Sequence, residues 1–421
     1  MADTVKRSSF LTALVDPVQP TAARSDSDYT FKGGALGWTT IPFLIGAALL
    51  VVSAIGWVVD PEQFYFSYLI GWTFCLTVTL GSMFFVMIQH LTKAYWVVAV
   101  RRIPEVLMYA FPVLIVLFIP IFFGMHDLYH WTHEAVFDPA SPEYDEILAG
   151  KEAYLNVPFY LIRIVFYFFI WTTISYKLYK LSIQQDVDPD PEIVLKQRRV
   201  SAWGMPLFAV TLAFASYDLL MSLDPHWFST MFGVYFFAGS FLSGLCLITL
   251  MLILLQQRGG MLTHTVTKEH YQDLGKLTFG FVVFWAYIAF SQYMLIWYGN
   301  IPEETVWFRH RLEHGWGSLS AALLIVHFIL PFLILLPRAT KRSIPLMSIM
   351  TVWLLIMHWI DLYWLSMPVL HEHAAFHWLD FTCWLGLFLV LISAFTWRLS
   401  RHPLVPQNDP LLPKSLHFEN T

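Results

Sequence analysis

Long apolar runs are the feature of this sequence that most limits its fold. Ten stretches, each about 20 residues long and separated by polar loops, consist almost wholly of apolar side chains. Apolar and polar residues do not alternate along them, so the runs predict helices and not the strands of a membrane barrel. Only 13% of the residues are charged, about half the share that is usual in soluble domains. The sequence therefore predicts an all-α polytopic membrane protein.

We expect ten transmembrane helices within residues 36–398, each long enough to cross a bilayer. They cover residues 36–59, 68–91, 106–124, 157–181, 202–223, 228–256, 274–298, 315–336, 344–367 and 376–398. Basic residues gather in the loops after the second, fourth, sixth and eighth helices, whereas the other loops hold only Lys151, Arg309 and Arg311. Because cytoplasmic loops are enriched in Lys and Arg, both termini are expected in the cytoplasm. Residues 1–35 would then form a cytoplasmic arm, and residues 399–421 a cytoplasmic tail.

Short landmarks recur at matching places along the apolar region. An Asp-Pro pair at 60–61 ends the first run as another at 224–225 ends the fifth, and Asp218 and Asp361 each lie seven positions before a proline. The shift between the copies is four helices, an even number, so the copies would have the same orientation in the membrane. Chance matches between short apolar segments are the alternative. We predict two parallel four-helix bundles, at about 68–223 and 228–367, with flanking helices at 36–59 and 376–398.

Ionisable side chains within apolar helices are rare and usually functional, because burying a charge there costs several kcal/mol. Asp218 and Asp361 lie at about the same depth, near the outer ends of their helices. His358 precedes Asp361 by one helical turn, and Arg163 lies at a depth suited to neutralising Asp218. We predict a proton path in two halves. Its candidates are Asp218, Arg163, Asp361, His358 and Asp380 in the outer half, His90, Glu105 and Lys276 in the inner half, and His327, Tyr167 and Tyr287 between them.

Groups on such a path need to take up and release protons near neutral pH, as histidines and desolvated carboxylates do. Glu105 is expected in the headgroup region, where it would be a solvated helix end. The alternative role for every candidate is polar contact between helices, which needs no proton movement. We favour a functional role for Asp218 and Asp361, and a structural role for His90 or His327 taken singly.

The histidines and cysteines bear on cofactors and metals. Histidines in two outer loops predict either a hydrated surface that docks partners or a metal site, and docking is favoured because no typical His/Glu metal signature surrounds them. A haem b needs two axial histidines at matched depth, a heme c needs Cys-x-x-Cys-His, and neither arrangement is present. The sequence therefore predicts no cofactor, metal or disulfide in this chain. The loop residues are His126, His130, His133, His371, Glu372, His373 and His377, the intramembrane histidines are His90, His327 and His358, and the cysteines are Cys75, Cys246 and Cys383.

Two longer motifs carry a resemblance to a known family. The segment SYDLLMSLDPHWFST at residues 216–230, continued by Gly-Val-Tyr at 233–235, and the segment QYMLIWYGNIPEET at 292–305 resemble the ActF-type membrane subunit of bacterial alternative complex III. Ten helices in two bundles with two flanking helices likewise resemble the wider polysulfide-reductase-like, or NrfD-like, membrane subunits. The resemblance extends over the helical region, from about residue 36 to residue 398.

This resemblance implies a multi-pass subunit of a quinol:electron-acceptor oxidoreductase in the bacterial inner membrane. The implied partners are a sister ten-helix membrane subunit, extracytoplasmic multihaem cytochrome c and Fe–S subunits, and the lipid bilayer. Menaquinol or another quinol would be the substrate of the complex, with cytochrome c or an oxidase as acceptor, and the sister subunit is the main candidate for quinol oxidation. This chain would hold no cofactor, would not be catalytic alone and would help to conduct protons.

Two other functions remain open on sequence grounds. One is an independent secondary transporter, although its repeats would commonly be inverted and its helices broken at the midplane. The other is a structural anchor for the cytochrome and Fe–S subunits, which explains the outer loops but not the two intramembrane aspartates. The net charge of −5 gives no indication of nucleic-acid binding.

Overall fold

Helices, joined by turns and loops, are the only regular secondary structure in the parts of the chain that the structure describes. The computed structural model describes residues 29–34 and 36–420, so nearly all of the expected N-terminal arm lies outside them. Within these residues, ten helical segments are long and apolar enough to cross a membrane. The prediction of an all-α polytopic membrane protein with ten spans is confirmed.

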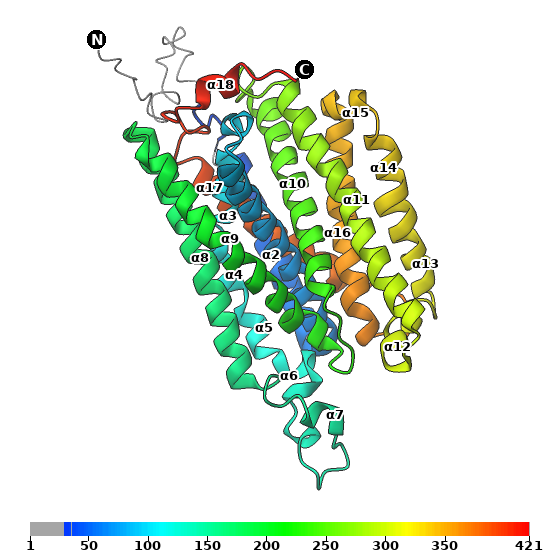
Figure 1. The fold of residues 1–421 in the computed structure, drawn as a ribbon. Helices are drawn as coiled ribbons and strands as arrows, with labels where there is room; N and C mark the ends of the chain where they lie inside the picture. The colour runs from blue at the N-terminus through cyan, green and yellow to red at the C-terminus, as the bar shows by residue number, and fades with distance from the viewer. Residues whose placement is uncertain (1–28, 35, 421) are drawn as a thin grey trace, which may run out of the picture.

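The spans follow one another along the chain as Figure 1 shows. They are η3–α1 (Leu36–Thr40, Ile41–Val59), α2 (Pro61–Thr92), α3–α4–α5 (Arg102–Met108, Phe111–Leu117, Ile119–Phe123), α8 (Val157–Val187), α9–η7 (Glu192–Leu219, Met221–Leu223), α10 (Phe232–Gly259), α11 (Lys268–Gly299), α13–η8–α14 (Trp316–Ala322, Leu323–Ile329, Leu330–Leu335), α16–η9 (Ile344–Ser366, Met367–Val369) and α17 (Trp378–Leu399). Short helices in the loops are η4 (Trp96–Ala99), α6 (Met125–Leu128), η5 (His130–Thr132), η6 (Glu134–Val136), α7 (Glu146–Ala149), α12 (Pro302–His310), α15 (Arg338–Arg342) and α18 (Leu412–Leu416).

Several helix bounds differ from those expected from the apolar runs. The second span begins at Pro61 and not at 68, because Asp60 caps it by accepting a hydrogen bond from the Gln63 backbone N–H at 3.2 Å. The third span is divided at two places, since Pro112 and Pro120 each lie in the first turn of a new short helix. Capping and proline geometry, which hydropathy does not measure, account for these differences.

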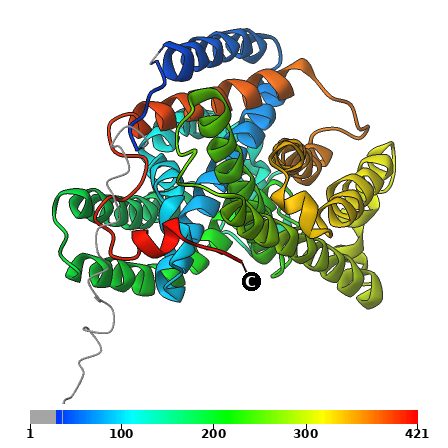
Figure 2. The same ribbon diagram turned by 90° about the horizontal axis from the view of Figure 1, so that it is seen from above.

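Helices α2 and α10 form the buried centre of the molecule. They approach each other through glycines: a Cβ at Gly244 would lie 2.8 Å from the backbone carbon of Gly81, and a Cβ at Gly81 would collide with the Ser240 carbonyl oxygen. Small residues at such crossings allow backbones in a membrane to pack closely. At the periphery, α1 packs on α17, and α17 packs in turn on α2 (Figure 2).

The contacts around this centre join the ten spans into one body. Helix α8 packs on α9, which contacts both α2 and α10, while α11 and α16 pack on the other side of α10. The flanking helices α1 and α17 lie side by side, although they are at opposite ends of the sequence. The grouping of the spans into two parallel four-helix bundles stays a prediction.

The C-terminal segment packs against the end of the helical body where α3 begins. Asp409 forms an ion pair with Arg101 at 2.7 Å, and the Ser415 hydroxyl donates to the Trp96 carbonyl at 2.7 Å. Burial alone would lower the pKa of Arg101, but the charges of Asp409 and Glu105 outweigh this effect and raise it. The expected tail is therefore held by specific polar contacts.

The α2–α10 contact predicts a large effect from a small substitution. Gly81→Ala should lower the thermal stability of the purified protein by about 1–3 kcal/mol, because the new methyl group must push the two helices apart. Gly280→Ala in α11 is the matched control, since nothing lies within 4 Å of the position of its Cβ. It should be neutral or slightly stabilising, as alanine favours helix more than glycine does. Equal melting temperatures for the two variants would show that the contact is not tight.

Candidate functional site

Asp218 is held in a closed ion-pair cluster between α8 and α9. Its carboxylate is fully buried and accepts two hydrogen bonds from the guanidinium of Arg163, both at 2.9 Å, and one from the hydroxyl of Tyr167 at 2.7 Å. Asn156 and Pro158 fix the start of α8, and this places Arg163 in its second turn. The guanidinium also donates to the Tyr154 carbonyl at 2.9 Å. The structure thus brings Arg163 to Asp218, as predicted, and adds Tyr167, which was expected between the two halves of the path.

This cluster resembles polar packing more than a proton relay. A bidentate arginine is the strongest partner that a buried carboxylate can have, and it compensates the negative charge without a proton. The Arg163 guanidinium lies over the Tyr154 ring at 3.9 Å, which fixes its position further. Asp218 is accordingly better suited to holding α9 on α8 than to exchanging protons.

Asp361 lies in a different environment, between α16, α10 and α11. It is 1% exposed, and its two oxygens accept hydrogen bonds from the Tyr235 hydroxyl and from the Trp285 indole N–H, the latter at 3.1 Å. No Lys or Arg forms an ion pair with it in the part of the chain that the structure describes. Because a buried carboxylate without a cation is costly in its ionised form, a proton is the compensating charge available to it.

Two histidines lie next to this carboxylate. His358, one turn earlier on α16, shares a hydrogen bond of 2.9 Å with Thr77 of α2, and both His358 and Asp361 face Gly239 of α10. A Cβ at Gly239 would lie 2.9 Å from the His358 ring and 3.9 Å from the carboxylate, so glycine leaves room for both groups. His327 stacks on Trp285 with ring centroids 4.1 Å apart. Trp285, one of the two donors of Asp361, therefore lies between the carboxylate and a second titratable ring.

The eighth span contains His327 in a π-helical segment, Leu323–Ile329. Such segments are rare and often lie at functional sites. Neither ring nitrogen of His327 has a hydrogen-bond partner in the described residues, although the side chain is fully buried. A buried imidazole with both nitrogens free is unusual and is consistent with a group that exchanges protons or a ligand.

The inner candidates do not form a common cluster. The expectation that Glu105 is a solvated helix end is wrong: it is fully buried, pairs with Arg101 at 2.8 Å and accepts from the Ser182 hydroxyl. The arginines that compensate the charge of Glu105 come from the same helix and from the loop before it. The depth of Glu105 in the membrane did not reveal them. Lys276 lies at the surface and pairs with Asp273 at 2.8 Å. These two residues are bound by local structural contacts.

The other candidates are spread over different environments. Tyr287 is 63% exposed on the outside of α11, so its predicted place between the two halves of the path is wrong. Hydropathy places a residue at a depth but does not choose its helix face. His90 is buried near the inner end, and its Nε2 has no partner among the described residues. Asp380 is buried and accepts hydrogen bonds from Ser67 at 2.6 Å and from Gln63 at 3.0 Å.

A cavity of about 460 Å³ adjoins the Asp361 cluster. Tyr235 and Trp285, the two donors of Asp361, form part of its wall, and so do Trp307, Arg311 and Trp364. Its volume lies within the range of small-molecule sites. Hydropathy gave no sign of this cavity, because its lining comes from α10, α11, the α12–α13 region and α16 together.

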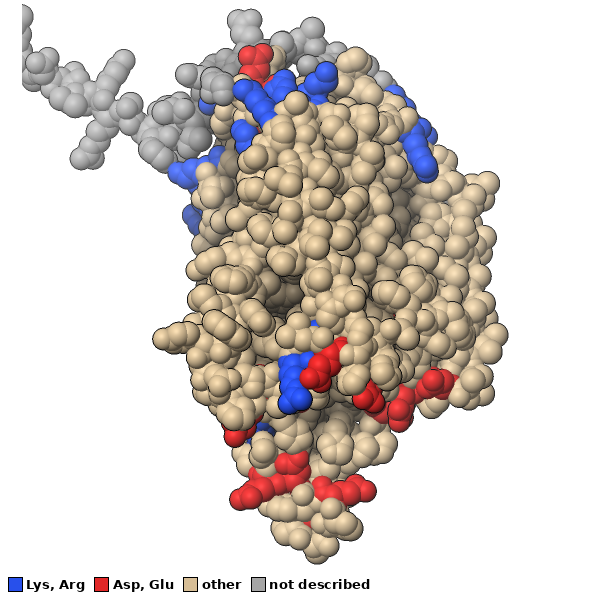
Figure 3. Space-filling view, turned by 90° about the vertical axis from the view of Figure 1, so that its right-hand side faces the viewer, with Lys and Arg blue, Asp and Glu red and all other residues tan. Residues whose placement is uncertain are grey.

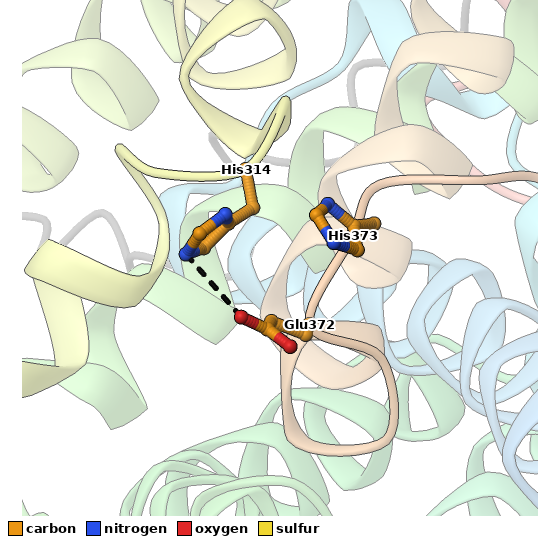
Figure 4. Close-up of side chains that lie close together, drawn as sticks. All are labelled: His314, Glu372 and His373. Carbon is orange, nitrogen blue, oxygen red and sulfur yellow. Dashed lines mark ion pairs between the residues drawn. The ribbon is translucent and has the colours of Figure 1, made fainter.

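The outer-loop histidines are arranged in two separate groups. In one loop, His126 and His133 stack with ring centroids 3.9 Å apart, and His133 also bonds the His126 carbonyl. In the other group, His314, Glu372 and His373 point toward one another from two loops (Figure 4), with ligand atoms within 4.8 Å. Ligands of one zinc ion lie roughly 3.4 Å apart, so this exposed group would have to contract around an ion. As it stands, it is a surface pair of His314 and Glu372 at 3.4 Å beside His373.

The most informative residues that the sequence analysis missed are Tyr235 and Trp285. Both lie in apolar helices, where a tyrosine or tryptophan is ordinarily read as packing, and neither spacing nor depth links them to Asp361. A faint signal existed, because Tyr235 ends the longer of the two family motifs. A scan against protein-family models and a search of curated proteins both find no match for this chain, so the resemblance stays a prediction.

The same change at the two aspartates should destabilise the protein to different extents. Asp218→Asn should cost about 3–5 kcal/mol of stability, because it leaves the buried charge of Arg163 without a counter-charge. Asp361→Asn should cost about 1 kcal/mol, since an amide can still accept from Trp285 and donate to the Tyr235 oxygen. Thermal melting of both purified variants measures the difference. If Asp361→Asn proved the more damaging, the contrast between a paired and an unpaired carboxylate would be wrong.

Proposed function

We propose that this chain is an integral membrane subunit of a quinol:electron-acceptor oxidoreductase respiratory complex, in which it contributes a proton-conducting path. The two motifs at 216–235 and 292–305 support the choice of complex through their resemblance to alternative complex III. Haem c and Fe–S clusters belong to its partner subunits in this proposal, and a sister membrane subunit oxidises the quinol. The chain itself is a conducting and anchoring element and not the catalytic centre.

The observation that carries the proton-conducting role is the environment of Asp361. It is a buried carboxylate with hydrogen-bond donors but no cation among the described residues, and His358 and His327 lie close by. A carboxylate in this setting exchanges a proton without losing an ion pair, as a relay group must. Asp218 is not part of the central path in this proposal, because Arg163 already neutralises its charge.

Polar groups along α2 provide an outer approach to this cluster. His371, which is half-buried in the loop before α17, bonds Gln63, and Gln63 and Ser67 both donate to Asp380. Thr77, the partner of His358, lies ten residues further along α2, or about 15 Å. Gln63, Ser67 and Thr77 share one face of the helix by their spacing. Water molecules would have to bridge the stretch from Ser67 to Thr77.

The distribution of charge supports an orientation with the termini in the cytoplasm. On the face seen in Figure 3, most Lys and Arg side chains gather at the end that carries α15 and α18, and most Asp and Glu side chains gather at the opposite end. Basic residues mark the cytoplasmic side of membrane proteins. In the proposal this membrane is the bacterial inner membrane, and the acidic end with its histidine loops docks the extracytoplasmic subunits.

One structural feature favours an alternative function, that of an independent secondary transporter. The π-helical segment of the eighth span lies beside both the cavity and the Asp361 cluster, as an irregular helix does at many transport sites. Purification from native membranes separates the two functions. A subunit should elute together with haem-bearing proteins and their Soret absorption, whereas a transporter should elute alone.

The proton path predicts a specific defect in the Asp361→Asn complex. In liposomes its proton translocation per electron should fall, because an amide cannot release a proton, while quinol oxidation in detergent should persist. Tyr287→Phe is the control, since that hydroxyl belongs to a largely exposed side chain outside the cluster. An unchanged proton stoichiometry in the Asp361→Asn complex would rule out the relay. A fall in detergent turnover would instead place Asp361 in a quinol site.

A further inference from the structure

Arg311 is a buried cation without an acidic partner in the part of the chain that the structure describes. Its side chain is 2% exposed, and its guanidinium lies over the Trp307 ring at 3.4 Å. Two of its N–H groups donate to backbone carbonyls, those of Trp307 at 3.0 Å and Leu365 at 2.7 Å. Its Nε has no hydrogen-bond partner among the described residues. Arginine has five N–H donors, so most of its capacity is unused.

The charge of Arg311 is also uncompensated. None of the ion pairs between described residues includes it, and Asp224 acts on it only from beyond ion-pair distance. Burial lowers the pKa of Arg311 to about 9, and the group therefore still carries its charge at neutral pH. Arg309, two residues earlier, is the contrast: it is exposed and pairs with Glu313 at 2.9 Å. A buried, charged and partly unsatisfied side chain calls for a compensating group from outside the chain.

Arg311 lines the cavity of about 460 Å³ described above. A second polar side chain, Gln292, lines it as well; it is 4% exposed, and its amide makes no hydrogen bond within the described residues. The remaining wall is almost wholly apolar and aromatic. Phe290 and Leu324 belong to the lining and are more than half exposed, which shows that the cavity opens toward the outside of the helical body. Figure 3 looks onto this side of the molecule and shows a hollow in its uncharged surface.

The position of the cavity opening shows whether a ligand would enter from water or from the lipid bilayer. Apart from Leu312, the exposed lining residues lie in α11 and in the eighth span, two membrane-spanning segments whose surfaces are mostly exposed and apolar. The cavity therefore opens sideways into lipid. Arg311 lies just before the eighth span, in the region between α12 and α13, where lipid headgroups are expected.

We propose that this cavity binds a membrane amphiphile whose oxyanion head is held by Arg311, with Gln292 as a second polar contact and the acyl chain against the aromatic wall. An oxyanion supplies the missing counter-charge and accepts N–H donors. A sugar or other polar solute would leave its hydroxyl groups against apolar walls, and a hydrocarbon would leave Arg311 uncompensated. A phospholipid phosphate and a fatty-acid carboxylate share the required chemistry. This site is independent of the proposed respiratory function.

Photo-crosslinking of the purified full-length protein in detergent tests the site directly. The probes are a phosphatidylglycerol, a palmitate and an uncharged diacylglycerol, each with a diazirine in the acyl chain, and peptide mapping locates the adducts. Adducts of an anionic probe should map to cavity-lining residues of α11 and α13 and exceed those of diacylglycerol by about tenfold. Phosphatidylglycerol adducts alone identify a phospholipid, and palmitate adducts alone identify a fatty acid.

Matched variants separate the site from general lipid contact. Arg311→Gln should reduce the labelling of the cavity by anionic probes about tenfold. Arg309→Gln, which removes an exposed charge nearby, should leave this labelling unchanged. Ala289→Phe places a phenyl ring at the cavity wall and leaves Arg311 unchanged, so it tests the site even if Arg311→Gln fails to fold. It should also reduce the labelling of the cavity by anionic probes. Equal labelling by the uncharged probe, or equal loss in the Arg309 and Arg311 variants, would overturn the proposal.

Discussion

A charge buried among apolar helices needs a compensating charge, and the way in which each buried group obtains one organises this structure. Asp218 obtains it from Arg163, and Glu105 obtains it from Arg101 and Arg102, which lie one helical turn or less away. These closed pairs tie neighbouring segments together. Asp361 and Arg311 obtain no such partner from the described residues. The unpaired groups are therefore where a proton or an external ligand has a role that the fold itself does not fill.

Helix α2 links the close packing of the centre with its polar contacts. Gly81 allows α10 to approach, and this approach brings Gly239 of α10 beside His358 and Asp361 of α16. On the same helix, Thr77 bonds His358 while Ser67 and Gln63 bond Asp380 of α17. A long, almost wholly buried helix can carry these polar residues only because neighbouring helices satisfy each of them. The position of Asp361 thus depends on a glycine contact elsewhere in the core.

Some features could be predicted from the sequence and others could not. The difference lies in the kind of information that each feature requires. Ten spans follow from hydropathy, and the Arg163–Asp218 pair followed from matched depth and opposite charge. Glu105 was misplaced because its partners lie at the membrane edge, where depth does not distinguish a solvated group from a paired one. Tyr287 was misplaced because depth does not select a helix face. Tyr235 and Trp285 went unnoticed because their hydrogen bonds join three helices whose contacts no local pattern encodes.

Tyr235 stands between the unpaired carboxylate and the cavity that the unpaired cation lines. Tyr235 donates to Asp361, and it also lines the cavity with Arg311 and is close enough to feel its charge. The charge of Arg311 acts on Tyr235, whereas the groups that act on Asp361 itself are the Tyr235 hydroxyl and the Trp285 N–H. An oxyanion bound to Arg311 would therefore reach the carboxylate only through the hydrogen bond that Tyr235 donates. A fold that neutralises Asp218 and Glu105 with arginines thus places a carboxylate and a guanidinium, each without an ion-pair partner among the described residues, on the two sides of one tyrosine.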